Sequence, residues 1–314
     1  MIKVIQCPQP VLHLKYHSPA ADKMSSQKKV SIICVVICAF CFGTMEIALK
    51  IGAASFTPLQ ITFLRFLLGG IVLLPFALVD LKRRAYHLTK SDWAYLTILA
   101  VTGMCVSMTL CQTGLLHSNA NTAAVIICSN PVFTMIFAHF LVNDRFTKRK
   151  ALVLVLSLLG MIFVSNPMDM AEGNTPEGII CVFVAAVLFG LFSAIGKKRV
   201  AVLGGMVQNS FSFLIGAVLM LIGLVATGQP VAEGITVSTL PVLLYAGIVV
   251  TGLGYWSYLK AIELAGPSFA SVAFFIKPVI ACIFSAIILS EEITWTTVLG
   301  VILVLVGSII NMRK

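Results

Sequence analysis

Charged residues are scarce in this chain. They make up 11% of the 314 residues, against roughly a quarter in soluble domains, and 59% of the residues are apolar. This composition excludes an ordinary soluble domain and predicts a protein that lives in lipid. Spans of about 20 residues with short connections leave room for about ten crossings and for no separate soluble domain.

Motifs of several other protein classes are also missing. The sequence has no phosphate-binding glycine loop, no HExxH motif and no paired intramembrane carboxylates, which argues against an ATP-driven pump and against an intramembrane enzyme. We therefore expect neither catalysis nor a cofactor. The nine cysteines indicate no disulfide framework. Cys34, Cys38 and Cys41 share a helix face and could hold a soft metal, but cysteine also packs as a small apolar residue, and we expect no metal.

Basic residues are distributed between the apolar runs rather than gathered on one face. The formal net charge is +10, yet this distribution argues against a nucleic-acid partner. Nineteen of the 22 Lys and Arg residues fall in the two termini and in alternate connections, whereas the other side of the membrane receives only Lys50. By the positive-inside rule, both termini are expected in the cytoplasm, with the protein in a bacterial plasma (inner) membrane.

The first 29 residues are polar and irregular. They lack the apolar core and small-residue cleavage site of a signal peptide, so residues 1–29 are expected to form a cytoplasmic tail, with Met24 as a second candidate start. Apolar runs predict ten transmembrane helices, at about 30–50, 58–80, 93–116, 119–142, 150–166, 178–197, 205–227, 238–259, 267–289 and 295–312.

The sequence repeats itself at a shift of 147 residues. Ile32-Ile33-Cys34-Val35 returns as Ile179-Ile180-Cys181-Val182, and Pro131-Val132 returns as Pro278-Val279. Matched Pro, Gly and Thr at one fixed shift indicate a true duplication. The first five-helix repeat is expected at 30–166 and the second at 178–312, joined by an external linker at 167–177. Because five spans is an odd number, the repeats should be inverted, which favours alternating access over an inert duplicated scaffold.

Several motifs of the two copies resemble those of one family. They are Phe42-Gly43 with Lys50, Pro58 and Arg65-Phe66; Ser129-Asn130-Pro131-Val132 with Asn143-Asp144-Arg145; and Lys277-Pro278-Val279 with Leu289-Ser290-Glu291-Glu292, Thr294, Gly300 and Gly307. On these residues the chain resembles the drug/metabolite transporter superfamily, specifically its EamA-type ten-helix members, over residues 30–312. The resemblance implies fold and transporter class. It says little about cargo, because the motifs are shared by transporters of many substrates. The residue before the ninth-helix proline is often acidic in that family and here is Lys277, so no substrate preference is carried over.

Ionisable side chains inside spans identify a candidate substrate site, since each costs about 2.5 to 3.5 kcal/mol on insertion scales. Lys277 lies near the middle of the ninth span. Its repeat partner, Asn130, also precedes a proline, and Pro131 and Pro278 are expected to kink their helices and loosen the turns before them. Alternatively, both prolines serve packing alone and Lys277 bonds to backbone carbonyls.

Glu46 and Arg65 lie at similar predicted depths. They could form a structural ion pair, or Glu46 could be a proton-coupling carboxylate, as in small multidrug relatives of the superfamily. Tyr255 and Trp256 follow the small residues Gly252 and Gly254, and we expect them to line the cavity, although these glycines mainly indicate close helix packing.

These residues favour a secondary transporter for a small polar metabolite, most simply an amino acid or a related organic acid. Lys277 would attract a carboxylate, while Glu46 or Asn130 would meet an amine or hydroxyl. The alternative is proton-coupled efflux of hydrophobic cations through Glu46 and aromatic side chains, which Lys277 disfavours. The expected partners are therefore a small-molecule substrate, the lipid bilayer and, as coupling ion, protons; the sequence leaves direction of transport, including export, and oligomeric state open.

Overall fold

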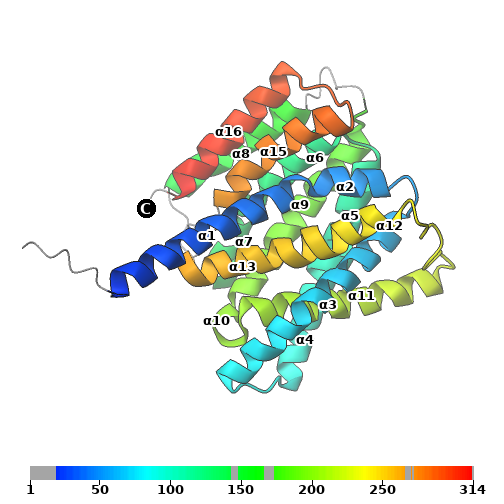
Figure 1. The fold of residues 1–314 in the computed structure, drawn as a ribbon. Coiled ribbons are helices and arrows are strands. Elements are labelled where there is room, and N and C mark those ends of the chain that lie inside the picture. Colours follow the sequence, from blue (N-terminus) through cyan, green and yellow to red (C-terminus); the bar gives the residue numbers. More distant parts are fainter. Residues whose placement is uncertain (1–18, 143–147, 166–172, 266–269, 271, 313–314) are drawn as a thin grey trace, which may run out of the picture.

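The chain is described here by a computed structural model, which covers residues 19–142, 148–165, 173–265, 270 and 272–312 (Figure 1). Within these ranges all regular structure is helical, as the sequence predicts. The elements are α1 (Pro19–Gly43), α2 (Met45–Gly52), α3 (Pro58–Arg84), α4 (Lys90–Leu99), the π-helix η1 (Ala100–Met108), α5 (Thr109–Leu116), α6 (Ala120–Cys128), α7 (Asn130–Val142), α8 (Lys148–Ser165), α9 (Pro176–Lys197), α10 (Val200–Leu203), α11 (Gly205–Ala226), α12 (Leu240–Leu244), the π-helix η2 (Tyr245–Leu253), α13 (Gly254–Ala265), α15 (Val272–Ile288) and α16 (Trp295–Met312).

Seven helical stretches among the described residues are long and apolar enough to cross a membrane. They are Gln27–Gly52, Pro58–Arg84, Lys90–Leu116, Ala120–Leu141, Pro176–Lys197, Gly205–Ala226 and Leu240–Ala265. Three shorter apolar helices, Ala151–Val164, Val272–Ile288 and Trp295–Gly307, stand where the sequence predicts the fifth, ninth and tenth spans. The chain is therefore an all-α membrane protein.

The tail before the first span is partly helical, which corrects the expectation of an irregular segment up to residue 29. α1 begins at Pro19. A proline suits the first turn of a helix, because its missing N–H would be unsatisfied there anyway. The alanines, lysines and methionine that follow are good helix formers, so the helix starts before the apolar run does.

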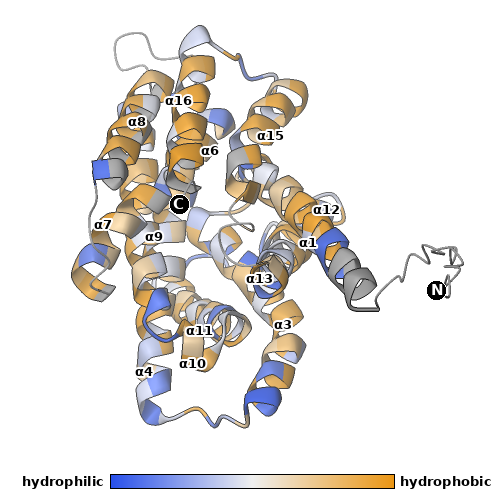
Figure 2. Cartoon of the chain, turned by 90° about the vertical axis from the view of Figure 1, so that its left-hand side faces the viewer, coloured by the Kyte–Doolittle hydropathy of each residue, from blue (hydrophilic) through white to orange (hydrophobic). Residues whose placement is uncertain are grey.

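The outer surface of the bundle is apolar. Large side chains such as Ile33, Val79 and Ile222 are each more than half exposed, whereas polar residues such as Gln112 and Asn121 are buried. Figure 2 shows the hydrophobic colour running along the helices and the hydrophilic colour gathered toward helix ends and loops. An apolar surface of this extent would be covered by lipid tails.

The two repeats make equivalent contacts with each other, as a pseudo-two-fold axis between them requires. α3 packs on its repeat partner α11, and α8 packs on its partner α16. α1 packs on α15, and the equivalent pair, α9 and α7, packs likewise. A Cβ on Gly43 would lie 2.5 Å from Ile280, and a Cβ on Gly190 would lie 2.5 Å from Phe133, which is the same contact shifted by 147 residues in both partners.

Irregular turns interrupt some spans. Both repeats carry a π-helix at nearly equivalent places, η1 in the third span and η2 in the eighth. Among the described residues, outright breaks within predicted spans occur in the first repeat, at Thr44 between α1 and α2 and at Ser129 between α6 and α7. Pro131 is the second residue of α7, directly after the second break, whereas α15 continues through Pro278. The break at Ser129 and the two π-helices provide the kind of non-standard backbone that often marks functional sites.

Candidate transport site

An ion pair between Glu46 and Lys277 lies inside the bundle. Nζ of Lys277 donates to Oε1 of Glu46 at 2.6 Å. The Lys277 side chain is 3% exposed and the Glu46 side chain is 1% exposed. The pair joins α2 to α15, and so the first predicted span to the ninth. The sequence placed both residues in the membrane interior, and the structure brings them into direct contact. Since Lys277 bonds to a carboxylate, the alternative in which it bonds only to backbone carbonyls is wrong.

The break at Thr44 positions this pair. The Thr44 hydroxyl lies 2.9 Å from the Phe40 carbonyl oxygen and 2.6 Å from the hydroxyl of Tyr245, which fixes the turn against η2. Gly43, just before it, allows close approach, because a Cβ there would lie 3.3 Å from the carbonyl oxygen of Lys277. Glu46 sits in the first turn of α2, directly beyond these residues, and so reaches α15.

Arg65 is buried nearby without an acidic partner among the described residues. Its guanidinium carbon lies 4.5 Å from the centre of the Phe66 ring, and its Nε and Nη1 make no hydrogen bond within the described structure. The Glu46–Arg65 ion pair that the sequence allowed is therefore wrong, because Lys277 takes that carboxylate. Oε2 of Glu46 likewise has no hydrogen-bond partner in the described chain. Both Glu46 and Tyr255 are within electrostatic reach of the Arg65 guanidinium.

An aromatic wall stands beside these charges. Phe66 and Phe213, which occupy equivalent positions in the two repeats, lie with their ring centres 4.8 Å apart. Tyr255 contacts Phe213 at 5.0 Å and Phe42 at 5.1 Å. Tyr255 is thus close to the charged groups. Trp256 is half-buried, and its ring centre lies 5.8 Å from that of Phe76 in α3.

The three charged residues of the site have uncharged residues at the equivalent positions of the other repeat. At a shift of 147 residues, Glu46, Arg65 and Lys277 correspond to Ser193, Ser212 and Asn130, which are all uncharged. Asn130 is buried at the start of α7, and Cys128, two residues before it, is within electrostatic reach of Lys277. The duplicated scaffold therefore carries a single charged centre, made by Glu46, Arg65 and Lys277, rather than two equivalent ones.

Sequence reasoning missed Gln112 and Thr109. Gln112 is buried in α5 and donates from Nε2 to the carbonyl oxygen of Leu49 at 3.1 Å. Its Oε1 and the Thr109 hydroxyl have no hydrogen-bond partner among the described residues. The available signal was their spacing of three residues, which places two polar side chains on one face of an otherwise apolar span.

The model for EamA-like transporters matches this chain twice, at residues 29–166 and 176–313. The chain belongs to the EamA-like transporter family. An uncharacterized transporter of Clostridium kluyveri is 37% identical over 289 residues, which cover 90% of this chain and 93% of the relative. The uncharacterized transporter YoaV of Bacillus subtilis is 25% identical over 86% of this chain and 92% of its own length.

One further relative is also a transporter, and one solved structure shares the fold. The uncharacterized inner membrane transporter YedA of Escherichia coli K12 is 24% identical over 87% of this chain and 90% of its own. One solved crystal structure superposes with a TM-score of 0.62 at 15% sequence identity, covering 91% of this chain and 96% of that one, and shows a shared fold. The chain is therefore a membrane transporter.

In this EamA-like transporter, a polar network links several loops at one end of the bundle. Nζ of Lys50 donates to Oε1 of Glu291 at 3.1 Å and to the Ser118 carbonyl oxygen at 2.6 Å. The Glu291 carboxylate also accepts from the backbone N–H groups of Ala120 (2.7 Å) and Asn121 (3.1 Å), at the start of α6. A carboxylate at a helix N-terminus is favoured by the helix dipole. Glu291 thus ties α6 to α2.

A second network links loops at the opposite end. The buried carboxylate of Asp92 lies 2.7 Å from Nη1 of Arg199 and accepts hydrogen bonds from Thr89 and from the Tyr86 hydroxyl. That hydrogen bond to Asp92 raises the pKa of Tyr86. These contacts join the connection between the second and third spans to the connection between the sixth and seventh.

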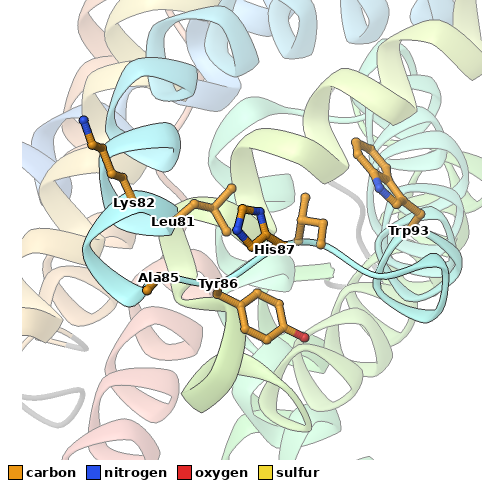
Figure 3. A pocket seen from close by; sticks show the side chains of 7 residues that line it. Leu81, Lys82, Ala85, Tyr86, His87 and Trp93 are labelled. Atoms are coloured by element: carbon orange, nitrogen blue, oxygen red, sulfur yellow. The ribbon is translucent and has the colours of Figure 1, made fainter.

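A hollow of about 540 Å³ opens beside this second network (Figure 3). It is lined by Leu81, Lys82, Ala85, Tyr86, His87, Leu88 and Trp93. These residues run from the end of α3 through the connection to the start of α4, and none belongs to the charged centre. The hollow is therefore a surface feature at the helix ends and is separate from the candidate transport site.

Proposed function

We propose that this EamA-like transporter is a secondary transporter that moves a small metabolite bearing a carboxylate, an amino acid or a related organic acid, by alternating access. One observation supports this substrate class above the others. The charged centre holds two cations, Arg65 and Lys277, and one anion, Glu46, so it carries a net charge of +1 when all three are ionised. An uncompensated buried charge is costly, and an anionic group on the substrate would offset that cost.

Arg65 is the group that we assign to the substrate carboxylate. The sequence favoured Lys277 for this role, but Lys277 already bonds to Glu46 at 2.6 Å. Nε and Nη1 of Arg65 have no partner among the described residues. A guanidinium donates charge-assisted hydrogen bonds to a carboxylate, and these give both affinity and orientation. Asn130, Tyr255 and Trp256 remain predicted contributors to binding.

The alternative cargo is a hydrophobic cation. The aromatic wall and Glu46 would suit it, but the net positive charge of the centre would repel it.

Glu46 is also the proposed site of proton coupling. Protonation of Glu46 would break its ion pair with Lys277 and loosen the contact between α2 and α15, which makes this carboxylate the proposed proton-coupling group.

The proposed orientation rests on the basic residues. Nineteen Lys and Arg residues fall on the side that carries both termini, and this favours cytoplasmic termini in an inner membrane. The pseudo-two-fold axis would then lie in the membrane plane, and the two repeats would provide two related states. On this orientation the Lys50–Glu291 network is external and the Asp92–Arg199 network is cytoplasmic. Export is one direction of transport that this arrangement permits.

A thermal-shift screen of the purified protein against amino acids, organic acids and lipophilic cations tests the substrate class, since ligand binding to the native state raises apparent stability. We expect stabilisation by a carboxylate-bearing ligand that is lost in Arg65→Met. Arg84→Met is the matched control, because Arg84 is partly exposed and pairs with Asp80 outside the centre. Stabilisation by lipophilic cations alone, lost in Glu46→Gln, would instead support the efflux alternative.

A further inference from the structure

Two polar side chains on one face of α5 have unsatisfied groups out of contact with solvent. Oε1 of Gln112 and the hydroxyl of Thr109 lack hydrogen-bond partners throughout the described part of the chain. The two residues are three positions apart and so share a helix face. Buried polar atoms are nearly always paired, and an unpaired one calls for an explanation such as a bound ligand.

The orientation of the Gln112 amide is fixed by its neighbour. Its Nε2 donates to the carbonyl oxygen of Leu49 at 3.1 Å. Turning the amide over would set two carbonyl oxygens against each other, with no donor between them. The Oε1 atom must therefore face away from Leu49, and it remains available to a donor from elsewhere.

This free acceptor lies beside the charged centre. Gln112 contacts α2 at Leu49, which lies three residues, or about 4.5 Å along the helix axis, beyond Glu46. Cys111, next to Gln112, is within electrostatic reach of Glu46, Arg65 and Lys277. Oε2 of Glu46 is a second unpaired acceptor, while Arg65 offers two unpaired donors. One region thus presents donors for an anionic group and acceptors for a cationic one.

We propose that Gln112 determines specificity by accepting a hydrogen bond from the ammonium group of an α-amino acid whose carboxylate is bound by Arg65. Glu46 Oε2 accepts a second ammonium hydrogen, and the Thr109 hydroxyl lines the same face. This inference rests on the proposed function and narrows it from carboxylates in general to zwitterions. An acid without the ammonium group would leave the buried acceptors unpaired, and sites built this way reject such analogues strongly.

The test compares amino acids with the acids that lack only the amino group. Calorimetric titration of the full-length purified protein would use glycine, alanine, leucine and phenylalanine, each beside its deaminated acid, for example leucine beside 4-methylpentanoate. For any amino acid that the wild type binds, we expect the affinity to be at least tenfold higher than for the corresponding deaminated acid. In Gln112→Met, which keeps the side-chain volume, its affinity should fall about 10- to 100-fold, whereas the deaminated acid should change by less than about threefold.

The control is Gln208→Met. Gln208 is also buried, but it donates to the Tyr95 hydroxyl at 3.3 Å, near the Asp92–Arg199 network. This variant should keep the wild-type preference for the amino acid. An unchanged preference in Gln112→Met would overturn the role of Gln112. If that variant does not fold, the wild-type comparison still decides, because equal binding of an amino acid and its deaminated acid overturns the inference and leaves the proposed function standing. Failure of every carboxylate to bind overturns both.

Discussion

The ammonium group of Lys277 lies 2.6 Å from the carboxylate of Glu46, so an ion pair joins α15 to α2 inside an apolar bundle. The equivalent positions in the other half of the duplication hold Asn130 and Ser193, which cannot form such a pair. Because Glu46 and Lys277 neutralise each other, Arg65 is the cation left to meet a substrate. This difference in charge between two similar halves supports the assignment of Arg65 to a substrate carboxylate.

The Glu46–Lys277 pair should show strong energetic coupling. Breaking a buried pair by removing one partner typically costs about 3 to 5 kcal/mol, whereas removing both charges is much less costly. We therefore expect Glu46→Gln and Lys277→Met each to lower thermal stability in detergent markedly, and the double variant to recover at least half of the loss. Thermal unfolding of the four proteins in one detergent measures the cycle.

The exposed pair Lys260–Glu263 provides the control for that cycle. Its atoms lie 2.9 Å apart, but both side chains are substantially exposed. Exposed pairs contribute about 0 to 1 kcal/mol, so the same cycle at these positions should show little coupling. Equal and additive losses at Glu46 and Lys277 would argue that the two residues act independently.

Glu46 is expected to couple transport to protons. With the carboxylate replaced in Glu46→Gln, proteoliposomes should lose the stimulation of uptake that an imposed pH gradient gives the wild type. Exchange without a gradient should continue at saturating substrate and at a temperature below unfolding of the variant, because an amide oxygen still accepts a hydrogen bond from the substrate. The control is Glu263→Gln, which removes a carboxylate from the surface of α13 and should keep the gradient dependence. Full gradient dependence in Glu46→Gln would exclude Glu46 as the coupling group.

Glu291 should matter more for stability than its neighbour Glu292. Glu291 accepts from Lys50 and from two backbone N–H groups of α6, whereas Glu292 is exposed and its backbone carbonyl makes the contact with Asn121. We expect Glu291→Ala to destabilise the protein by about 1 to 3 kcal/mol, because it leaves buried donors unpaired. Glu292→Ala should change stability by less than about 0.5 kcal/mol. Thermal unfolding compares them, and equal effects would contradict the role given to Glu291.

Gly43 and Gly190 should be similarly intolerant of a methyl group. A Cβ would lie 2.5 Å from Ile280 at Gly43 and 2.5 Å from Phe133 at Gly190, so the helices must separate. Overpacking of this kind costs about 1 to 3 kcal/mol, and we expect both alanine variants to unfold at lower temperature than the wild type. Gly223→Ala is the control, because its Cβ would be 3.7 Å from its nearest neighbour, Leu59, and alanine favours the helix. A normal unfolding temperature for Gly43→Ala would refute the close contact.

The structure followed the sequence wherever the information was local or periodic. Long apolar runs identify helices because backbone groups in lipid must be satisfied within the segment. Lys277, Glu46 and Arg65 stood out because each is costly inside a span. The start of α1 at Pro19 differed from the irregular tail expected up to residue 29, because residues of high helix propensity extend the helix before the apolar run.

Which buried groups contact one another was decided by the tertiary structure alone. Glu46 pairs with Lys277, 231 residues away, rather than with Arg65, because Gly43 and the turn at Thr44 bring α2 against α15. Gln112 was not recognised from the sequence, because the importance of its amide depends on the carbonyl of Leu49 from another helix. The sequence by itself determined the all-α membrane class, the duplication and the family, since these depend on composition and repetition along the chain. The partners of each charge depend on distances across the bundle, and only the packing of the helices set those.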